Sequence, residues 1–170
     1  MKKNFLLFLL IPFVIIGCQS NKCVITESTF FLTMTNMQFF PKRYLNKEIT
    51  LDCFTYNVSD VNNNTYCCGV RKCTAGFGCK CGKDTVIGFI LNYEGEIPEP
   101  RNQYEDTNEK TWIHITGQLV SEEKTSIEIY SYDTDGNITD QTETVQFLSF
   151  NVSSLELIAD YAKLKYFVSK

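Results

Sequence analysis

The stretch Ile49-Thr50-Leu51-Asp52-Cys53-Phe54-Thr55-Tyr56 is the clearest indication of the fold. Its apolar residues alternate with Thr50 and Asp52, which is the period of a strand with one buried face. Comparable patterns recur along the chain and are separated by turn-rich segments. They predict six strands, over residues 49–58, 66–74, 85–93, 111–120, 126–132 and 144–152.

Helical signals are few. Phe30, Met34 and Met37 recur at near-helical spacing and predict one short helix. The polar segment 97–110 is a connection that could include a short helical crossing, and 154–167 fits either a helix or a strand. The economical architecture is mainly β, a small barrel or sandwich with one or two short helices.

The N-terminus has the order of a secretory signal. Two lysines at positions 2 and 3 precede an apolar run from Phe5 to Ile16, which is short for a membrane-spanning helix. The run Ile15-Ile16-Gly17-Cys18 resembles the lipobox of bacterial lipoproteins, in which signal peptidase cuts before the cysteine and the thiol carries a diacylglycerol. We therefore expect Cys18 to anchor the protein to a membrane of the bacterial cell envelope, outside the cytoplasm.

These signals predict a signal peptide (1–17), a lipidated tether (18–28) and a single β-rich domain (29–170). The leader contains two of the 16 basic residues, so the mature chain would carry 14 basic and 20 acidic residues, a net charge of −6. An acidic balance argues against nucleic acid as a partner and against electrostatic adhesion to anionic lipid. Membrane attachment is therefore expected to come from the acyl chains.

Seven cysteines remain once Cys18 is set aside, and an odd number leaves at least one thiol for a role other than an internal disulfide. Five of them lie in a glycine-rich loop predicted over 67–83. They are candidates for disulfides, for a metal site such as zinc, or for redox and metal-trafficking work. This cluster consists of Cys67, Cys68, Cys73, Cys79 and Cys81, and the further candidates for disulfides are Cys23 and Cys53.

The spacing of the cluster is not that of a standard zinc site. Cys67 and Cys68 are adjacent, and adjacent side chains on a regular strand point to opposite faces. They would reach one ion only if the glycine-rich loop wraps around it. Disulfides, a metal site and thiol exchange all stay open on the residues alone.

The single histidine, His114, shares a predicted strand face with Trp112. Histidine suits metal binding or acid–base chemistry in principle. No Ser, Cys or Asp near it in the sequence indicates a catalytic triad. We interpret His114 as a half-buried structural residue and identify no catalytic residue, so an enzymatic activity is not expected.

Four stretches follow the order of a known family pattern: Tyr44-Leu45-Asn46-Lys47, Ile49 to Tyr56, the pair Cys67-Cys68, and Thr111-Trp112-Ile113-His114-Ile115-Thr116-Gly117. The domain resembles the C-terminal domain of the YcgQ-like subunits of bacterial two-component permease complexes. Lys110 stands where that family usually has an acid. The resemblance implies an OB-like fold and a link to zinc or other metal homeostasis, and it transfers no activity.

Together these observations predict a non-enzymatic, lipid-anchored binding or accessory domain outside the cytoplasm, linked to metal homeostasis or to a membrane transport complex. Its expected partners are the membrane, through the anchor, and a permease or metal-handling protein. One alternative is a thiol redox or metal-delivery protein that acts through residues 67–81. Another is a structural surface lipoprotein stabilised by disulfides.

Overall fold

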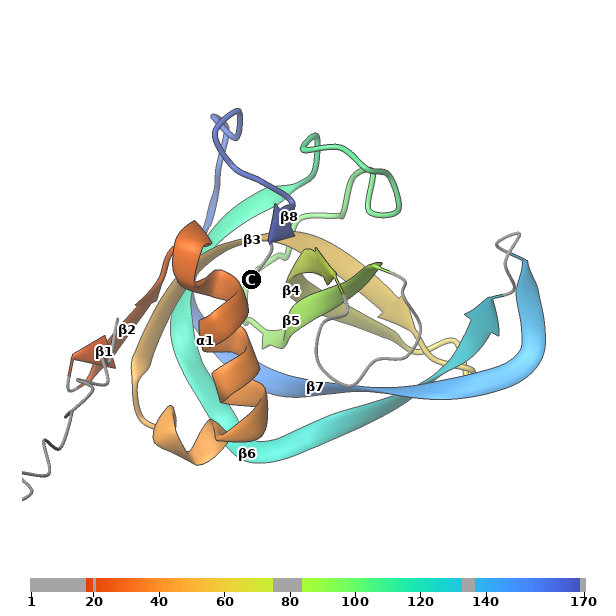
Figure 1. Cartoon of the computed structure of the whole chain (residues 1–170), viewed down its shortest axis with the longest axis horizontal. Coiled ribbons are helices and arrows are strands. Elements are labelled where there is room, and N and C mark those ends of the chain that lie inside the picture. Colours follow the sequence, from red (N-terminus) through yellow and green to blue (C-terminus); the bar gives the residue numbers. More distant parts are fainter. Residues whose placement is uncertain (1–17, 20, 75–83, 133–136, 169–170) are drawn as a thin grey trace, which may run out of the picture.

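The computed structural model describes residues 18–19, 21–74, 84–132 and 137–168. Its centre is a single sheet in which five strands close into a ring (Figure 1). The ring strands are β3 (Glu48–Ser59), β4 (Thr65–Thr74), β5 (Asp84–Asn92), β6 (Trp112–Tyr132) and β7 (Ile138–Leu157). The mainly β, barrel-like fold predicted from the sequence is confirmed.

The ring closes because β3 pairs with different neighbours along its length. Residues 49–54 of β3 pair with β6, and residues 54–59 pair with β4. From β4 the ring continues through β5 and β7 back to β6. Every pairing in the ring is antiparallel except that of β5 with β7, which is parallel and short.

Short elements extend the sheet beyond the ring. On one side β2 (Lys22–Ile25) pairs in parallel with β3, and β1 (Cys18–Gln19) pairs with β2. On the other side β8 (Phe167–Val168) pairs in parallel with β4. The chain between β2 and β3 forms α1 (Glu27–Phe39) and the short helix η1 (Pro41–Arg43), so the helix predicted from Phe30, Met34 and Met37 is confirmed.

The two faces of the strands pack into two cores. The helix-side core buries Phe30, Met34 and Met37 of α1 against residues of the ring strands such as Leu51 and Phe150. The tail-side core is covered by the C-terminal tail, and its buried residues are Phe54, Val58, Cys68, Val70, Ile90, Trp112, Ile127 and Phe147. Neighbouring residues of β3 therefore belong to different cores, as the alternating pattern predicts.

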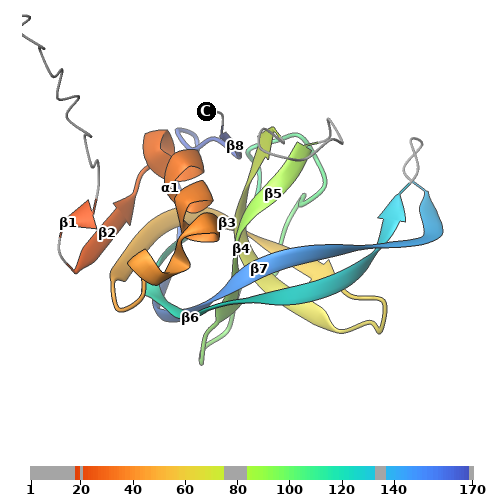
Figure 2. The same ribbon diagram turned by 60° about the horizontal axis from the view of Figure 1, so that its bottom comes forward.

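Two predicted strands, 111–120 and 126–132, are one continuous strand, β6. The polar residues between them form an irregularity in the pairing with β7, where the register shifts between Leu119 and Lys124. The ladder resumes afterwards, so β6 and β7 run on together beyond the ring as a long arm (Figures 1 and 2). No Gly or Pro separates the two predicted segments, and the chain consequently stays extended.

The two ambiguous segments are also resolved. The connection 97–110 consists of turns and bends and has no helical crossing. The C-terminal segment continues as a strand to Leu157, and the part that follows is not helical, so the helical alternative for 154–167 is wrong. Ile158, Tyr161, Leu164 and Tyr166 of this tail pack against the tail-side core.

The folded part of the chain begins earlier than residue 29. Residues 22–25 were expected in a tether, whereas in the structure they form β2, with Cys23 and Ile25 buried and Lys22 and Val24 exposed. This four-residue alternation is too short to stand out in the sequence, and its pairing with β3 stabilises it. Among the described residues, no helix has the length and apolar character to cross a membrane.

Candidate functional site

The cysteine cluster is divided between a strand and residues that lie outside the described part of the chain. Cys67, Cys68 and Cys73 belong to β4, so the first part of the predicted loop 67–83 is a strand. The strand predicted over residues 66–74 is thereby confirmed, since this stretch pairs with both β3 and β5. Cys79 and Cys81 are not among the described residues.

On β4 the two adjacent thiols face opposite ways. Cys68 lies in the tail-side core. Cys73 follows five residues later, so its side chain is on the opposite face, and it lies in the helix-side core with Cys23 and Cys53. Cys67 and Cys68 consequently cannot ligate one ion from this strand. Within the described ranges, no group of three or more His, Cys, Asp and Glu side chains is placed to hold a metal ion.

The thiols of β3 and β4 are poor nucleophiles in this environment. Burial raises the pKa of Cys68 to about 12, and burial also raises the pKa of Cys53 far above its ordinary value. The pKa of the partly exposed Cys67 is raised as well, first by desolvation and then by the charge of Glu99. Because the thiolate is the reactive form, these three residues are not suited to thiol exchange at neutral pH.

His114 is half-exposed and has a partner that the sequence did not reveal. Its Nδ1 lies 2.6 Å from Oδ1 of Asp52, which is directly opposite on β3. The other neighbour of His114 across the ladder is Glu156 of β7. This arrangement is a cross-strand pair at a half-exposed position, and the structural role of His114 stays a prediction.

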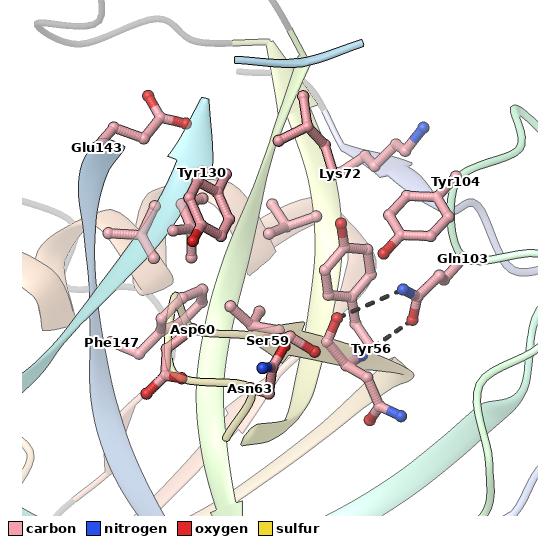
Figure 3. Close-up of a pocket in the computed structure, with 16 residues that line it drawn as sticks. Tyr56, Ser59, Asp60, Asn63, Lys72, Gln103, Tyr104, Tyr130, Glu143 and Phe147 are labelled. Carbon is pink, nitrogen blue, oxygen red and sulfur yellow. Dashed lines mark hydrogen bonds between the residues drawn. The ribbon is translucent and has the colours of Figure 1, made fainter. Parts of the chain in front are cut away.

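A groove of about 580 Å³ borders the tail-side core, between the second half of β3 and the β6–β7 arm. Figure 3 shows Tyr130, Glu143 and Phe147 on the side of the arm, and Tyr56, Gln103 and Tyr104 on the opposite side. The remaining residues that line it are Asn57, Val58, Ser59, Asp60, Asn63, Lys72, Val86, Ile129, Ile138 and Val145. The structure brings these side chains together from six separate stretches of the chain.

The wall opposite the arm is a loop that is fastened to β3. The Gln103 side chain accepts a hydrogen bond from Asn57 N (2.9 Å) and donates one to Asn57 O (3.4 Å), so it pairs with β3 as a neighbouring strand would (Figure 3). Next to it, the rings of Tyr56 and Tyr104 meet edge to face with 5.9 Å between their centroids. Tyr104 is nevertheless 72% exposed, which leaves its other face available to a ligand.

Two buried cations fix separate parts of the fold, and one of them holds the loop. Lys110 Nζ donates to Asn102 O (2.6 Å) and Glu105 O (2.8 Å), which fixes the loop on both sides of Gln103 and Tyr104. Arg71 lies between the rings of Phe30 and Trp112, with its Cζ 5.1 Å from each centroid. Both cations serve the packing, and neither points a free charge at the groove.

The charge of the groove excludes some ligands. Its lysine, Lys72, is engaged in an ion pair with Asp106 (2.8 Å), and the pair lowers the pKa of Asp106. The carboxylates of Asp60 and Glu143 also line the groove. An apolar and aromatic surface with carboxylates at its edge favours a neutral or cationic ligand with apolar groups over an anionic polymer.

The groove was not predicted from the sequence. The feature that marks it best is a set of exposed large side chains, because Tyr104, Tyr130 and Ile138 are all exposed and all line the groove. Exposure of this kind at three separated positions marks an interaction surface, but it is visible only in the folded chain.

The ring and its arm define a small, mainly β domain. A family model, the DUF1980 C-terminal domain, matches residues 16–132, which is well over half of the 170 residues, and the chain belongs to this family. The match supports the resemblance to the YcgQ-like domain, and it ends at the last residue of β6, before β7 begins. A search of the curated proteins and a search of the solved structures found no match.

Proposed function

We propose that this protein is a lipid-anchored binding domain outside the cytoplasm, and that the groove takes a segment of a partner polypeptide. The observation that carries the proposal is the groove, because it combines about 580 Å³ of space with exposed aromatic side chains and a fastened wall. Such a surface suits recognition, and the described residues offer no nucleophile activated by a nearby base. The five-strand ring is of the OB-like type in this proposal.

A polypeptide is favoured over other neutral ligands by the edge of β7. Residues 142–147 of β7 pair with β6 on one side, and the parallel pairing with β5 begins only at Leu148. Alternate side chains of this stretch, Glu143, Val145 and Phe147, line the groove. An extended peptide can add to such an edge through main-chain hydrogen bonds while its side chains enter the groove.

The anchor and the partner follow from the sequence features. A diacylglycerol on Cys18 would hold the domain at the surface of a bacterial membrane, and the family resemblance favours a membrane permease or a metal-handling protein as the partner. The link to zinc or other metals belongs to this partner rather than to the described thiols, which are buried or separated.

A photo-crosslinking experiment tests the groove. A photoreactive residue replaces Tyr104 in the full-length protein in its native bacterium, and in a control it replaces Leu157, which is also exposed but lies at the far end of β7. We expect an adduct with a membrane transport or metal-handling protein from position 104 alone, and its loss when Val145→Glu is added. Adducts from both positions, or an adduct that Val145→Glu does not affect, would contradict the proposal.

The anchor has its own test. Cys18→Ser should abolish acyl labelling of the protein and leave an uncleaved precursor. Unchanged labelling would exclude lipidation at Cys18.

The alternative functions depend on residues 67–81, of which Cys79 and Cys81 lie outside the described ranges. Counting thiols and metal together on the purified protein separates these functions. Stoichiometric zinc with four thiols that resist alkylation until a chelator is added would favour metal delivery. Reversible disulfide exchange with glutathione, near the redox potential of the compartment, would favour a role in thiol redox chemistry. The absence of both would favour a structural role for the cysteines.

A further inference from the structure

A second exposed surface lies at the end of α1, far from the groove. Phe39 and Phe40 are 63% and 48% exposed, and Leu32, two helical turns before Phe39, is exposed as well. Three cations follow directly in the sequence, Lys42, Arg43 and Lys47. We call these six residues the basic–aromatic patch.

The segment of chain that carries the patch is positive, although the protein as a whole is acidic. No Asp or Glu occurs from Ser28 to Lys47, and the next acid, Glu48, is paired with Lys22 (2.9 Å). The cations are held against aromatic rings: Arg43 Cζ lies 4.6 Å from the centroid of Phe40, and Lys47 Nζ lies 5.6 Å from that of Tyr44. Exposed phenylalanines beside cations are the composition of surfaces that enter the interface of a membrane.

The fold places this patch next to the N-terminal strand. Glu48, which follows Lys47, donates its N–H to Asn21 O (2.8 Å), and Lys22 pairs with Glu48 in the parallel ladder of β2 and β3. Cys18 lies in β1, which pairs with β2. In both overall views β1, α1 and the start of β3 are at one end of the molecule and the β6–β7 arm is at the other (Figures 1 and 2).

We propose that the basic–aromatic patch rests on a bilayer that contains anionic lipids, as a second membrane contact beside the acyl anchor. The proposal rests on the lipid anchor proposed above for Cys18. Phe39 and Phe40 enter the interface, and Lys42, Arg43 and Lys47 lie at the level of the headgroups. The domain is thereby oriented, with the arm and the groove directed away from the membrane.

The net charge of the chain makes this contact dependent on salt and on the anchor. The mature lipoprotein would carry −6, so an anionic surface repels it at long range, and the patch attracts it once the anchor has brought the patch within a Debye length. Each cation near such a surface favours the docked state about fivefold. Screening by salt should weaken the contribution of the cations to docking and leave the contribution of Phe39 and Phe40 unchanged.

The test uses the complete lipoprotein, purified in detergent and reconstituted into vesicles of phosphatidylcholine with or without phosphatidylglycerol, with acyl chains brominated near the headgroup. Phe39→Trp provides an indole at the patch, and quenching by bromine reports its entry. The native Trp112 is 1% exposed and gives a constant background. Tyr104→Trp is the matched control, because position 104 is at least as exposed as position 39 and lies at the groove.

We expect strong quenching for Phe39→Trp in vesicles with phosphatidylglycerol, weaker quenching without it, and none above background for Tyr104→Trp. Arg43→Gln and Lys47→Gln should each lower the docked-to-undocked ratio about fivefold. Lys124→Gln, an equal change of charge on exposed β6, should not affect it. Leu32→Trp serves as a second indole position in the patch should Phe39→Trp not fold.

Several results would overturn the proposal. The first is equal quenching of the two indoles, and the second is quenching that does not depend on phosphatidylglycerol. The third is a Phe39→Trp indole that is not quenched, also when a second copy or a protein partner covers it. A failed anchor is distinguishable, because the protein would then lack the acyl label. With the label present and the Phe39→Trp indole unquenched, the anchor stands and the patch contact does not.

Discussion

Replacing Lys110 with methionine should destabilise the fold and release the loop that forms one wall of the groove. Lys110 is 1% exposed, and its ammonium group donates to the carbonyls of Asn102 and Glu105. Methionine has a similar length and shape, so Lys110→Met keeps most of the packing. It removes the ammonium donor from both carbonyls, which flank Gln103 and Tyr104, while Asn102 O keeps the N–H of Glu105 (3.1 Å).

The magnitude follows from opposing contributions. A hydrogen bond from a charged donor contributes about 1.5–3 kcal/mol, so the loss of two costs about 3–6 kcal/mol. Burial lowers the pKa of Lys110 because desolvation disfavours the ammonium, and the removal of the charge returns part of the loss. The methionine also keeps apolar contact with the rings of Phe54 and Tyr166. We expect the free energy of unfolding to fall by about 2–4 kcal/mol.

Urea unfolding followed by the fluorescence of Trp112 measures this change. Trp112 is the single tryptophan of the chain, and its Nε1 donates to Asn108 O (2.8 Å) in the same loop. Lys124→Met is the matched control, since Lys124 is exposed on β6 and its loss should cost less than about 0.5 kcal/mol. Trypsin cleavage after Arg101, in the loop itself, should become faster in Lys110→Met under native conditions.

Equal unfolding free energies for Lys110→Met and Lys124→Met would refute the reasoning. So would a destabilised Lys110→Met in which cleavage after Arg101 is unchanged, because the loop would then be held by other contacts.

Three further predictions concern β3, β4 and the turn between them. Gly69→Ala should cost about 1–3 kcal/mol, because the added Cβ would lie 2.8 Å from Cys53 Sγ, and Cys53→Ala in the same chain should recover part of it; strictly additive losses in urea unfolding would exclude this contact. A hydrogen bond from Asn64 is the main reason why the pKa of Asp60 lies below its usual range, so this carboxylate stabilises the fold above the ordinary pKa of aspartate, and the contribution is lost as the pH falls through the lowered value. The melting temperature of Asp60→Asn should therefore decline less below about pH 4 than that of the wild type, and parallel declines would contradict the prediction. At neutral pH an alkylating reagent should modify the partly exposed Cys67 before the buried Cys68, which peptide mass spectrometry resolves, and equal rates would argue against the burial.

Much of the ring could be predicted from local patterns. The alternation in Ile49–Val58 and the β-branched stretch Thr85–Tyr93 predict β3 and β5 within a residue or two of their observed ends. The length of β6 was missed, because polar residues in a strand irregularity resemble a break when they are read alone. The strand β2 was missed since four alternating residues become a strand only through their partner, β3.

The candidate site was less accessible to sequence reasoning. The opposite directions of Cys67 and Cys68 follow from strand geometry and were foreseen as a consequence of it. The partner of His114 was not, because Asp52 is distant in the sequence and becomes a neighbour through the pairing of β3 with β6. Likewise, nothing local distinguishes Lys110 from an exposed lysine, although it is among the most deeply buried side chains of the described protein.

By itself, the sequence determined the mainly β character of the protein, the helix marked by Phe30, Met34 and Met37, and the family, because periodicity and short motifs are properties of consecutive residues. The secretory leader and the lipidation at Cys18 are predictions that rest on the sequence in the same way. Only the tertiary structure decided which distant residues meet. The groove exists because the closure of the ring and the reach of the β6–β7 arm bring Tyr56, Tyr104 and Tyr130 to one surface. The basic–aromatic patch lies beside the N-terminal strand because β2 pairs with β3, and no local pattern contains that pairing.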